Sequence, residues 1–365
     1  MSSKPSSKER PLDIDYRNGP VPDWVERAID EHLAIEREDA KSAGSLGFMA
    51  RALVIACMPY KDPKMDAFTR TNGDFRLRIV AGYEGGIPFG IYPRLLMSWV
   101  TTEAVRNQSP VIQLGDSLNT FLREVLNLRH TGGERGSGTR VAEQMKRLFG
   151  SLVTAQYTGG LNNRGFTLRN VLIADGMHLS AEDERRLEAQ LGADAPADGE
   201  EGDTKLWTPQ ELHEAGSWQS HVKLSPEFFK ECVSNPVPID LRAYKALRGS
   251  PLAMDIYTWL SYRMSYTLRE TRPIRWEALM GQFGSSYSGS EGDVSQAVRN
   301  FKKAFLKQLA AVQIVYPEAK VKLHDHGLIL QPSRPHVAPA VGVTRSKKLV
   351  AGKGSGTLPL FGEDE

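Results

Sequence analysis

An acidic segment in the middle of the chain limits how the rest can fold. Residues 181–203 contain nine acidic residues and two arginines, and the wider stretch 174–216 has few aromatic residues. A segment of this composition cannot bury enough apolar surface to offset the conformational entropy lost on ordering. We therefore expect a disordered linker, with a stretch on each side long enough for one compact domain.

Positive charge gathers on both sides of this acidic segment. Residues 131–170 contain six Lys and Arg and two acidic residues, and residues 298–323 contain six Lys and Arg and one acidic residue. The formal net charge of +2 conceals this alternation. Two basic islands around an acidic one indicate that local charge, and not total charge, determines what the chain binds.

The part before the acidic segment predicts a defined order of elements. A continuous apolar run at 52–58 suggests a buried strand, and residues 75–80 alternate apolar and basic side chains, as in a strand with one solvated face. A helix from Pro93, a strand at 111–114, helices at 117–128 and 139–149, and strands at 152–157 and 166–173 follow. Helix, strand, helix, helix and hairpin is the order of a winged helix-turn-helix domain.

The part after the acidic segment predicts the same layout again. A strand at 221–224 and a helix from Pro226 lead into helices that begin near Asp240 and at Pro251, the latter with an apolar face around Trp259. A short helix at 275–283, a loop and a long helix at 293–311 come next. Strands at 312–316, 321–323 and 328–331 would complete a second hairpin.

The predicted fold class is therefore α+β, with two tandem winged helix-turn-helix domains joined by an acidic linker and flanked by disordered tails. The expected boundaries are a polar, partly helical segment at 1–45, a first domain at 46–175, the linker at 176–216, a second domain at 217–335 and a flexible tail at 336–365.

The long helix at 293–311 carries the strongest functional signal. At about 100° per residue, apolar side chains such as Phe301 and Phe305 gather on one arc, and cations and amides gather on the opposite arc. Such an arc can place cations on phosphates and amides on adenine edges in a major groove. The alternative is an ordinary amphipathic helix with a solvated basic face. Including the hairpin that follows, the candidate DNA-binding residues here are Gln296, Arg299, Asn300, Lys302, Lys303, Lys307, Lys320 and Lys322.

The first domain offers a similar but smaller set. In the helix at 139–149, Val141, Met145 and Leu148 should face inward, while Glu143 and three cations should face outward. The predicted hairpin tip adds one further cation, of the kind that reaches the DNA backbone or minor groove. A solvated surface is the alternative here too. The candidate DNA-binding residues of this domain are Arg140, Lys146, Arg147 and Arg164.

Enzymatic interpretations fit less well. The glycine-rich turn at 131–138 lacks the GK[ST] of a Walker loop and does not follow a buried strand. His324 and His326 flank Asp325 just before a glycine, which favours a polar hairpin turn over a metal pair. Tyr257, on an apolar helix, is expected to pack and not to act as a nucleophile. We expect no catalytic residue, metal or cofactor, and no enzymatic activity.

The cellular setting is expected to be the cytoplasm. Cys57 and Cys232 are far apart and have no CxxC partner, which is typical of reduced thiols. No window approaches the roughly 18 apolar residues of a membrane span, and the polar N-terminus has no apolar signal region.

Several stretches resemble the RepA family of plasmid replication initiators. In the first half they are residues 86–105 (GIPFGIYPRLLMSWVTTEAV), 114–118 (LGDSL), 131–133 (TGG) and 144–149 (QMKRLF). In the second half they are residues 237–242 (VPIDLR), 250–266 (SPLAMDIYTWLSYRMSY) and 316–319 (YPEA). The resemblance covers about residues 48–337, and the acidic insert is the least familiar part.

The resemblance implies a protein that binds direct repeats in duplex DNA at a plasmid origin, helps to open the duplex and recruits host helicase and initiator machinery. Related initiators dimerise to repress their own gene, so a homodimer is a further expected partner. A transcriptional repressor of its own operon, with no initiator role, is the alternative function.

The C-terminal tail contains one more candidate motif. Residues 357–361 (TLPLF) are similar to the pentapeptide by which many bacterial proteins bind the DNA polymerase sliding clamp, although Thr357 and Pro359 depart from the usual pattern. Leu358, Leu360 and Phe361 keep the apolar anchors that would fill a hydrophobic pocket. The alternative is a tail without a partner.

Overall fold

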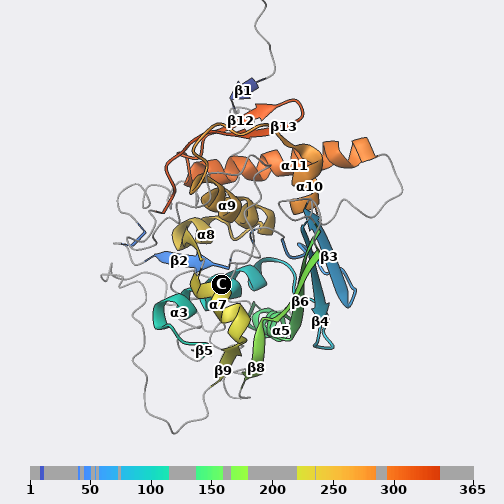
Figure 1. Cartoon of the computed structure of the whole chain (residues 1–365), viewed down its shortest axis with the longest axis vertical. Helices are drawn as coiled ribbons and strands as arrows, with labels where there is room; N and C mark the ends of the chain where they lie inside the picture. Colours follow the sequence, from blue (N-terminus) through green and yellow to red (C-terminus); the bar gives the residue numbers. More distant parts are fainter. Residues whose placement is uncertain are drawn as a thin grey trace, which may run out of the picture.

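The structure is a computed structural model that describes residues 9–11, 40–41, 45–50, 54, 57–72, 75–114, 137–158, 166–179, 220–234, 236–284 and 294–337. Within these residues the fold is mixed α/β (Figure 1). No helix in this part of the chain is long and apolar enough to cross a membrane.

A four-stranded antiparallel sheet forms one side of the molecule (Figure 1). Its order is β3 (Ala67–Asn72), β4 (Phe75–Ala81), β6 (Ser151–Thr158) and β7 (Phe166–Leu172). Along β4, Phe75, Leu77 and Ile79 are buried, and the arginines between them are exposed. The alternation predicted for this strand is confirmed.

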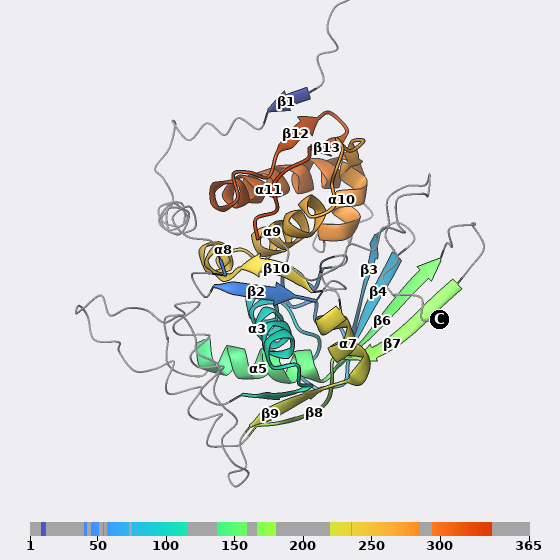
Figure 2. The ribbon, with the colours of Figure 1, turned by 60° about the vertical axis from the view of Figure 1, so that its left-hand side comes forward.

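Helix α3 (Ile91–Asn107) runs through the centre of the molecule and packs against α5 (Ser137–Phe149) and α7 (Pro226–Ser234) (Figure 2). Next to them, β5 (Val111–Gln113), β9 (His221–Leu224) and β8 (Ala174–His178) form a three-stranded sheet in that order. Val222 and Leu224 are buried in this sheet.

This small sheet differs from the predicted domain boundaries. The predicted boundaries place strand β9 and helix α7 in the second domain, but these elements pair and pack with elements of the first. Strand β8 takes up the beginning of the predicted linker at 176–178. The alternating pattern of β9 fixed its conformation but could not indicate which strand it would pair with. Residues 180–219, most of the predicted linker, lie outside the described residues.

The remaining helices form the other part of the molecule. Helix α8 (Leu241–Leu247) is capped by Asp240, and α9 (Pro251–Met264) by Ser250, whose hydroxyl accepts from the amide of Ala253 at 3.2 Å. Helix α10 (Trp276–Phe283) ends at Gly284, and α11 (Val294–Val315) lies across α9. A second four-stranded sheet has the order β1 (Glu9–Pro11), β12 (Val321–His324), β13 (Gly327–Leu330) and β11 (Ile274–Arg275).

Two predicted strands are wrong. Residues 312–315 form the last turn of α11, because Val312 and Val315 continue the buried stripe of Phe301, Phe305 and Leu309. In the run 52–58, Val54 is helical and Cys57 and Met58 lie in no strand, although all three side chains are buried. The Arg94 guanidinium donates to the Met58 carbonyl at 2.7 Å and so takes the place of a strand partner.

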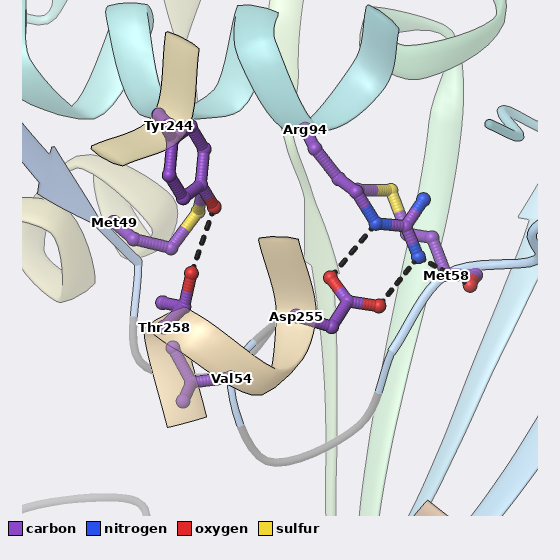
Figure 3. A pocket seen from close by; sticks show the side chains of 7 residues that line it. All are labelled: Met49, Val54, Met58, Arg94, Tyr244, Asp255 and Thr258. Atoms are coloured by element: carbon purple, nitrogen blue, oxygen red, sulfur yellow. Dashed lines mark hydrogen bonds and ion pairs between the residues drawn. The ribbon is translucent and has the colours of Figure 1, made fainter. Parts of the chain in front are cut away.

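The two parts share one hydrophobic core. Strand β2 (Leu46–Met49) pairs with β10 (Val237–Asp240), and the Gln282 amide on α10 donates to the Val54 carbonyl at 2.9 Å. Figure 3 shows the buried ion pair at this seam, in which Arg94 on α3 makes two hydrogen bonds to Asp255 on α9, at 2.8 and 2.7 Å. The orientation of the two parts is therefore fixed by direct contacts.

A buried carboxyl group in α3 should make stability depend on pH. Burial raises the pKa of Glu103 to about 7, although the Asn107 amide at 2.9 Å and the Arg106 charge oppose the shift. Because the folded-state pKa lies above the unfolded one, this group contributes stability below about pH 4.5 that is lost as pH rises through 7. Glu103→Gln should raise the free energy of unfolding at pH 8 and change it little at pH 4.5, as measured by urea titration. An equal effect at both pH values would contradict this account.

Candidate DNA-binding surface

Helix α11 separates an apolar face from a cationic face. Phe301, Phe305 and Leu309 are fully buried, and the ring of Phe305 lies 5.3 Å from Phe283, which in turn lies 5.6 Å from Trp259 on α9. Phe283 lies on α10, and α11 also contacts α9 directly, so the prediction that the apolar arc docks on the Trp259 helix is confirmed. The opposite arc is exposed, and α11 contains no acidic residue. The predicted residues on this exposed arc are Gln296, Arg299, Asn300, Lys303 and Lys307.

The polar side chains near the start of α11 are held by one another. The Arg299 guanidinium donates to the Gln296 side-chain oxygen at 2.8 and 3.1 Å, and the Gln296 amide donates to Asn300 at 2.9 Å. This row is ordered along the helix surface one turn apart. A guanidinium and two amides in such a row present both donors and acceptors, the groups that base edges in a major groove require.

Lys302 and the hairpin lysines have other contacts. The Lys302 ammonium lies 5.0 Å from the centre of the Trp276 ring, so it contacts α10 and lies at the edge of the cationic arc. Lys320 is exposed before β12, and Lys322 on β12 forms a 3.2 Å ion pair with Glu270. DNA could recruit Lys322 only in competition with this carboxylate.

The β12–β13 hairpin is held against α10 by close backbone contacts. The Trp276 amide donates to the His326 carbonyl at 3.0 Å, and a Cβ atom on Gly327 would overlap the Ile274 carbonyl oxygen and lie 3.0 Å from the Arg275 Cα. Only glycine therefore fits where β13 begins beside β11. This explains why a glycine follows the two turn residues, Asp325 and His326.

Gly327→Ala should loosen the hairpin. Because the clash is with backbone, we expect a loss of about 1–3 kcal/mol in the free energy of unfolding, measured by urea titration. Gly249→Ala is the matched control, because a Cβ there meets nothing within 4 Å. Equal stability of the two variants would disprove the close approach.

Helix α5 presents less charge than predicted. Arg140 is exposed and Lys146 is half-buried. Arg147 does not face outward as expected: its side chain is 13% exposed, lies 5.1 Å from the Phe89 ring and pairs with Glu143 at 2.8 Å and Asp62 at 3.5 Å. The carboxylate of Asp62 comes from a loop that helical periodicity cannot reveal. Arg164, and the clamp-motif residues Leu358, Leu360 and Phe361, lie outside the described residues.

Sequence reasoning missed one strand of the sheet that contains the β12–β13 hairpin. Strand β1 pairs with β12, with Arg10 opposite Leu323. Three residues in a polar N-terminus carry no strand pattern, so no signal could have found this pairing. Arg76 and Arg78 on β4 are exposed, and the apolar–basic alternation of the sequence does indicate this, but the alternation alone does not predict a binding role.

The described residues hold no group of three or more His, Cys, Asp or Glu side chains that could bind a metal ion. His324 ends β12 and His326 lies in the turn before β13, with ring centres 5.5 Å apart. Tyr257 is buried, accepts from the Asp240 amide at 2.9 Å and has a raised pKa because of desolvation. A phenol in this setting packs, as predicted, and is a poor nucleophile.

Comparisons with known proteins agree with the resemblance of the sequence motifs. The family described as plasmid-encoded RepA protein matches residues 87–195 and 186–278, which together exceed half of the chain. Among curated proteins none matches significantly. A crystal structure of domains 2 and 3 of RctB is similar at 12% identity and a TM-score of 0.42, over 78% of this chain and 95% of that chain. A second structure of these RctB domains has 12% identity and a TM-score of 0.39, over 76% and 94%. The extent of the family match establishes that this chain belongs to the plasmid-encoded RepA proteins.

Proposed function

We propose that this chain initiates plasmid replication by binding direct repeats in duplex DNA at the origin, with α11 in the major groove. The observation that carries the proposal is the exposed, acid-free arc of α11 beside an ordered hairpin. Cations on this arc would neutralise phosphates, and Gln296, Arg299 and Asn300 would contact base edges. Family membership supports a role in plasmid replication.

The second part of the chain supports a winged-helix interpretation. Its order is α9, β11, α10, α11, β12 and β13, and β11 pairs with β13, so α10 and α11 would be the two helices of a helix-turn-helix and the hairpin its wing. The first part has α3, β5, α5 and the β6–β7 pair in the corresponding order. There β5 pairs with β9, so the first winged helix would be a modified one.

The interaction should depend strongly on salt. For each phosphate neutralised, the slope of log affinity against log salt concentration changes by about −0.9. Footprinting on the DNA that flanks the gene would find the repeats, and titrations of a repeat duplex at several salt concentrations would give the slope. Salt-independent binding, or no protected repeat, would refute the proposed role of the cationic arc.

An initiator and a repressor of the same operon can be separated by one experiment. A plasmid that carries only this gene and its adjacent repeats should replicate autonomously if the chain is an initiator, and should fail to replicate if it is only a repressor.

We further propose that the chain opens the duplex without catalysis of its own. Nicking of supercoiled origin DNA by the purified protein would contradict this.

The proposed partners are the origin duplex, host helicase and initiator machinery and a second copy of this chain.

For the tail, we propose binding to the sliding clamp through Leu358, Leu360 and Phe361. Leu360→Ala with Phe361→Ala should abolish capture of the chain by immobilised clamp, and unchanged capture would refute the tail motif.

A further inference from the structure

We propose that the outer face of the sheet β3-β4-β6-β7 is a second DNA surface, which holds the phosphate backbone beside the repeat contacted by α11. This inference rests on the proposed function and extends it to the first part of the chain. In the first part of the chain the main cationic surface is then the sheet and not α5, because Arg147 on α5 is paired with Glu143 and Asp62.

The strand register places two arginines at the centre of this face. Arg76 lies between Thr71 on β3 and Gln156 on β6, and Arg78 lies between Thr69 and Thr154. The Thr154 hydroxyl donates to the side-chain oxygen of Asn170 on β7 at 2.8 Å and so continues the second row. At the described positions of this face the sequence has no acidic residue.

Both arginines are available for a ligand. They are exposed, and neither has an ion pair or hydrogen bond to another side chain in the part of the chain that the structure describes. Two residues along a strand span about 6.8 Å, so the two guanidinium groups can reach different phosphates along one DNA strand. Hydroxyl and amide groups around them are the usual additional donors to phosphate oxygens.

The sheet also contacts α10, the helix that precedes α11. The β3 end of the Thr71–Arg76 row contacts α10, where a Cβ on Gly281 would lie 3.0 Å from the Thr71 carbonyl oxygen. Figures 1 and 2 both show the end of β3 next to α10. In a helix-turn-helix the first helix crosses the DNA backbone, so a duplex bound at α11 would pass α10 and reach this end of the sheet.

A protein partner is the competing occupant. At the far end of the same face Val80, Leu152 and Leu172 form an apolar row, and Leu172 is 47% exposed. That row is short, whereas the centre of the face carries two cations and no carboxylate. Charge complementarity therefore favours nucleic acid over a second copy of the chain.

The test compares Arg76→Gln/Arg78→Gln with wild type on two duplexes. The short duplex contains one repeat as defined by footprinting, and the long duplex adds roughly 10 base pairs, about one helical turn, on each side. On the long duplex the salt slope should be smaller by about 1.8, because each lost phosphate contact contributes about 0.9. On the short duplex the two proteins should bind alike. Lys61→Gln/Lys223→Gln, which removes two exposed charges outside the sheet, is the matched control.

The outcomes separate the two proposals. If wild type binds the repeat with a steep salt slope but the arginine variant keeps that slope on the long duplex, the sheet inference is wrong and the proposed function stands. Unchanged DNA binding with altered sedimentation of the variant would assign the face to a second copy and overturn the inference. If wild type binds no repeat, both the proposed function and the sheet inference are wrong.

Discussion

Replacing Arg299 and Lys303 together by alanine is expected to weaken binding to the origin repeats strongly. Both side chains lie on the exposed arc of α11, opposite the buried phenylalanines, so their loss should leave the core intact. Each lost specific contact costs about 1–3 kcal/mol, so affinity for the repeat should fall at least roughly tenfold. Fluorescence anisotropy with a repeat duplex and a scrambled duplex measures the change.

Two further variants make this result interpretable. Arg299→Lys keeps the positive charge but loses the planar fork, so it should weaken discrimination between repeat and scrambled DNA more than it weakens affinity for scrambled DNA. The Lys61→Gln/Lys223→Gln control should bind nearly as wild type. Origin binding by the alanine double variant equal to that of wild type, with equal stability, would remove α11 from the interface.

Local pattern predicted most elements and the two hairpins β6–β7 and β12–β13, but not the pairing of distant strands. Helices α5, α9 and α10 have bounds close to those expected, and α3 begins near the expected Pro93, because apolar periodicity and start signals such as Pro251 are local properties. Pairing between distant strands, as in β2–β10 and β5–β9, has no local signature. This is why the sequence suggested two separate domains and the structure shows a shared core.

The candidate site was predictable to the same extent. Helix geometry alone separates the exposed arc of α11 from its buried stripe, and the structure agrees at every described position of the arc named in the sequence. Side-chain partners from other elements were not predictable. Each of these contacts joins two segments that are far apart in the sequence, and helical periodicity describes only one segment at a time. The contacts are Asp62 with Arg147, Glu270 with Lys322 and the Trp276 ring with Lys302.

Asp255→Ala is expected to cause the largest loss of stability. Arg94 is almost fully buried, and its guanidinium donates to both Asp255 oxygens and to the Met58 and Gly90 carbonyls, at 2.7 and 2.6 Å. Burial opposes the charge on Arg94, but the Asp255 carboxylate outweighs this effect and raises the Arg94 pKa. Without the carboxylate a buried cation would remain uncompensated, which costs about 3–5 kcal/mol. Urea unfolding at pH 7 measures this loss.

The control for this prediction removes both charges. Arg94→Met/Asp255→Leu puts apolar side chains in the same space, and such replacements of buried pairs are often neutral. The double variant should therefore be more stable than Asp255→Ala alone.

The same substitution should also affect DNA binding, because the pair joins α3 to α9. Only the long duplex needs both parts of the chain in a fixed orientation, so Asp255→Ala should weaken binding to the long duplex more than to the short one. A loss below about 1 kcal/mol, outside the range for breaking a buried pair, would show that the seam does not depend on this pair.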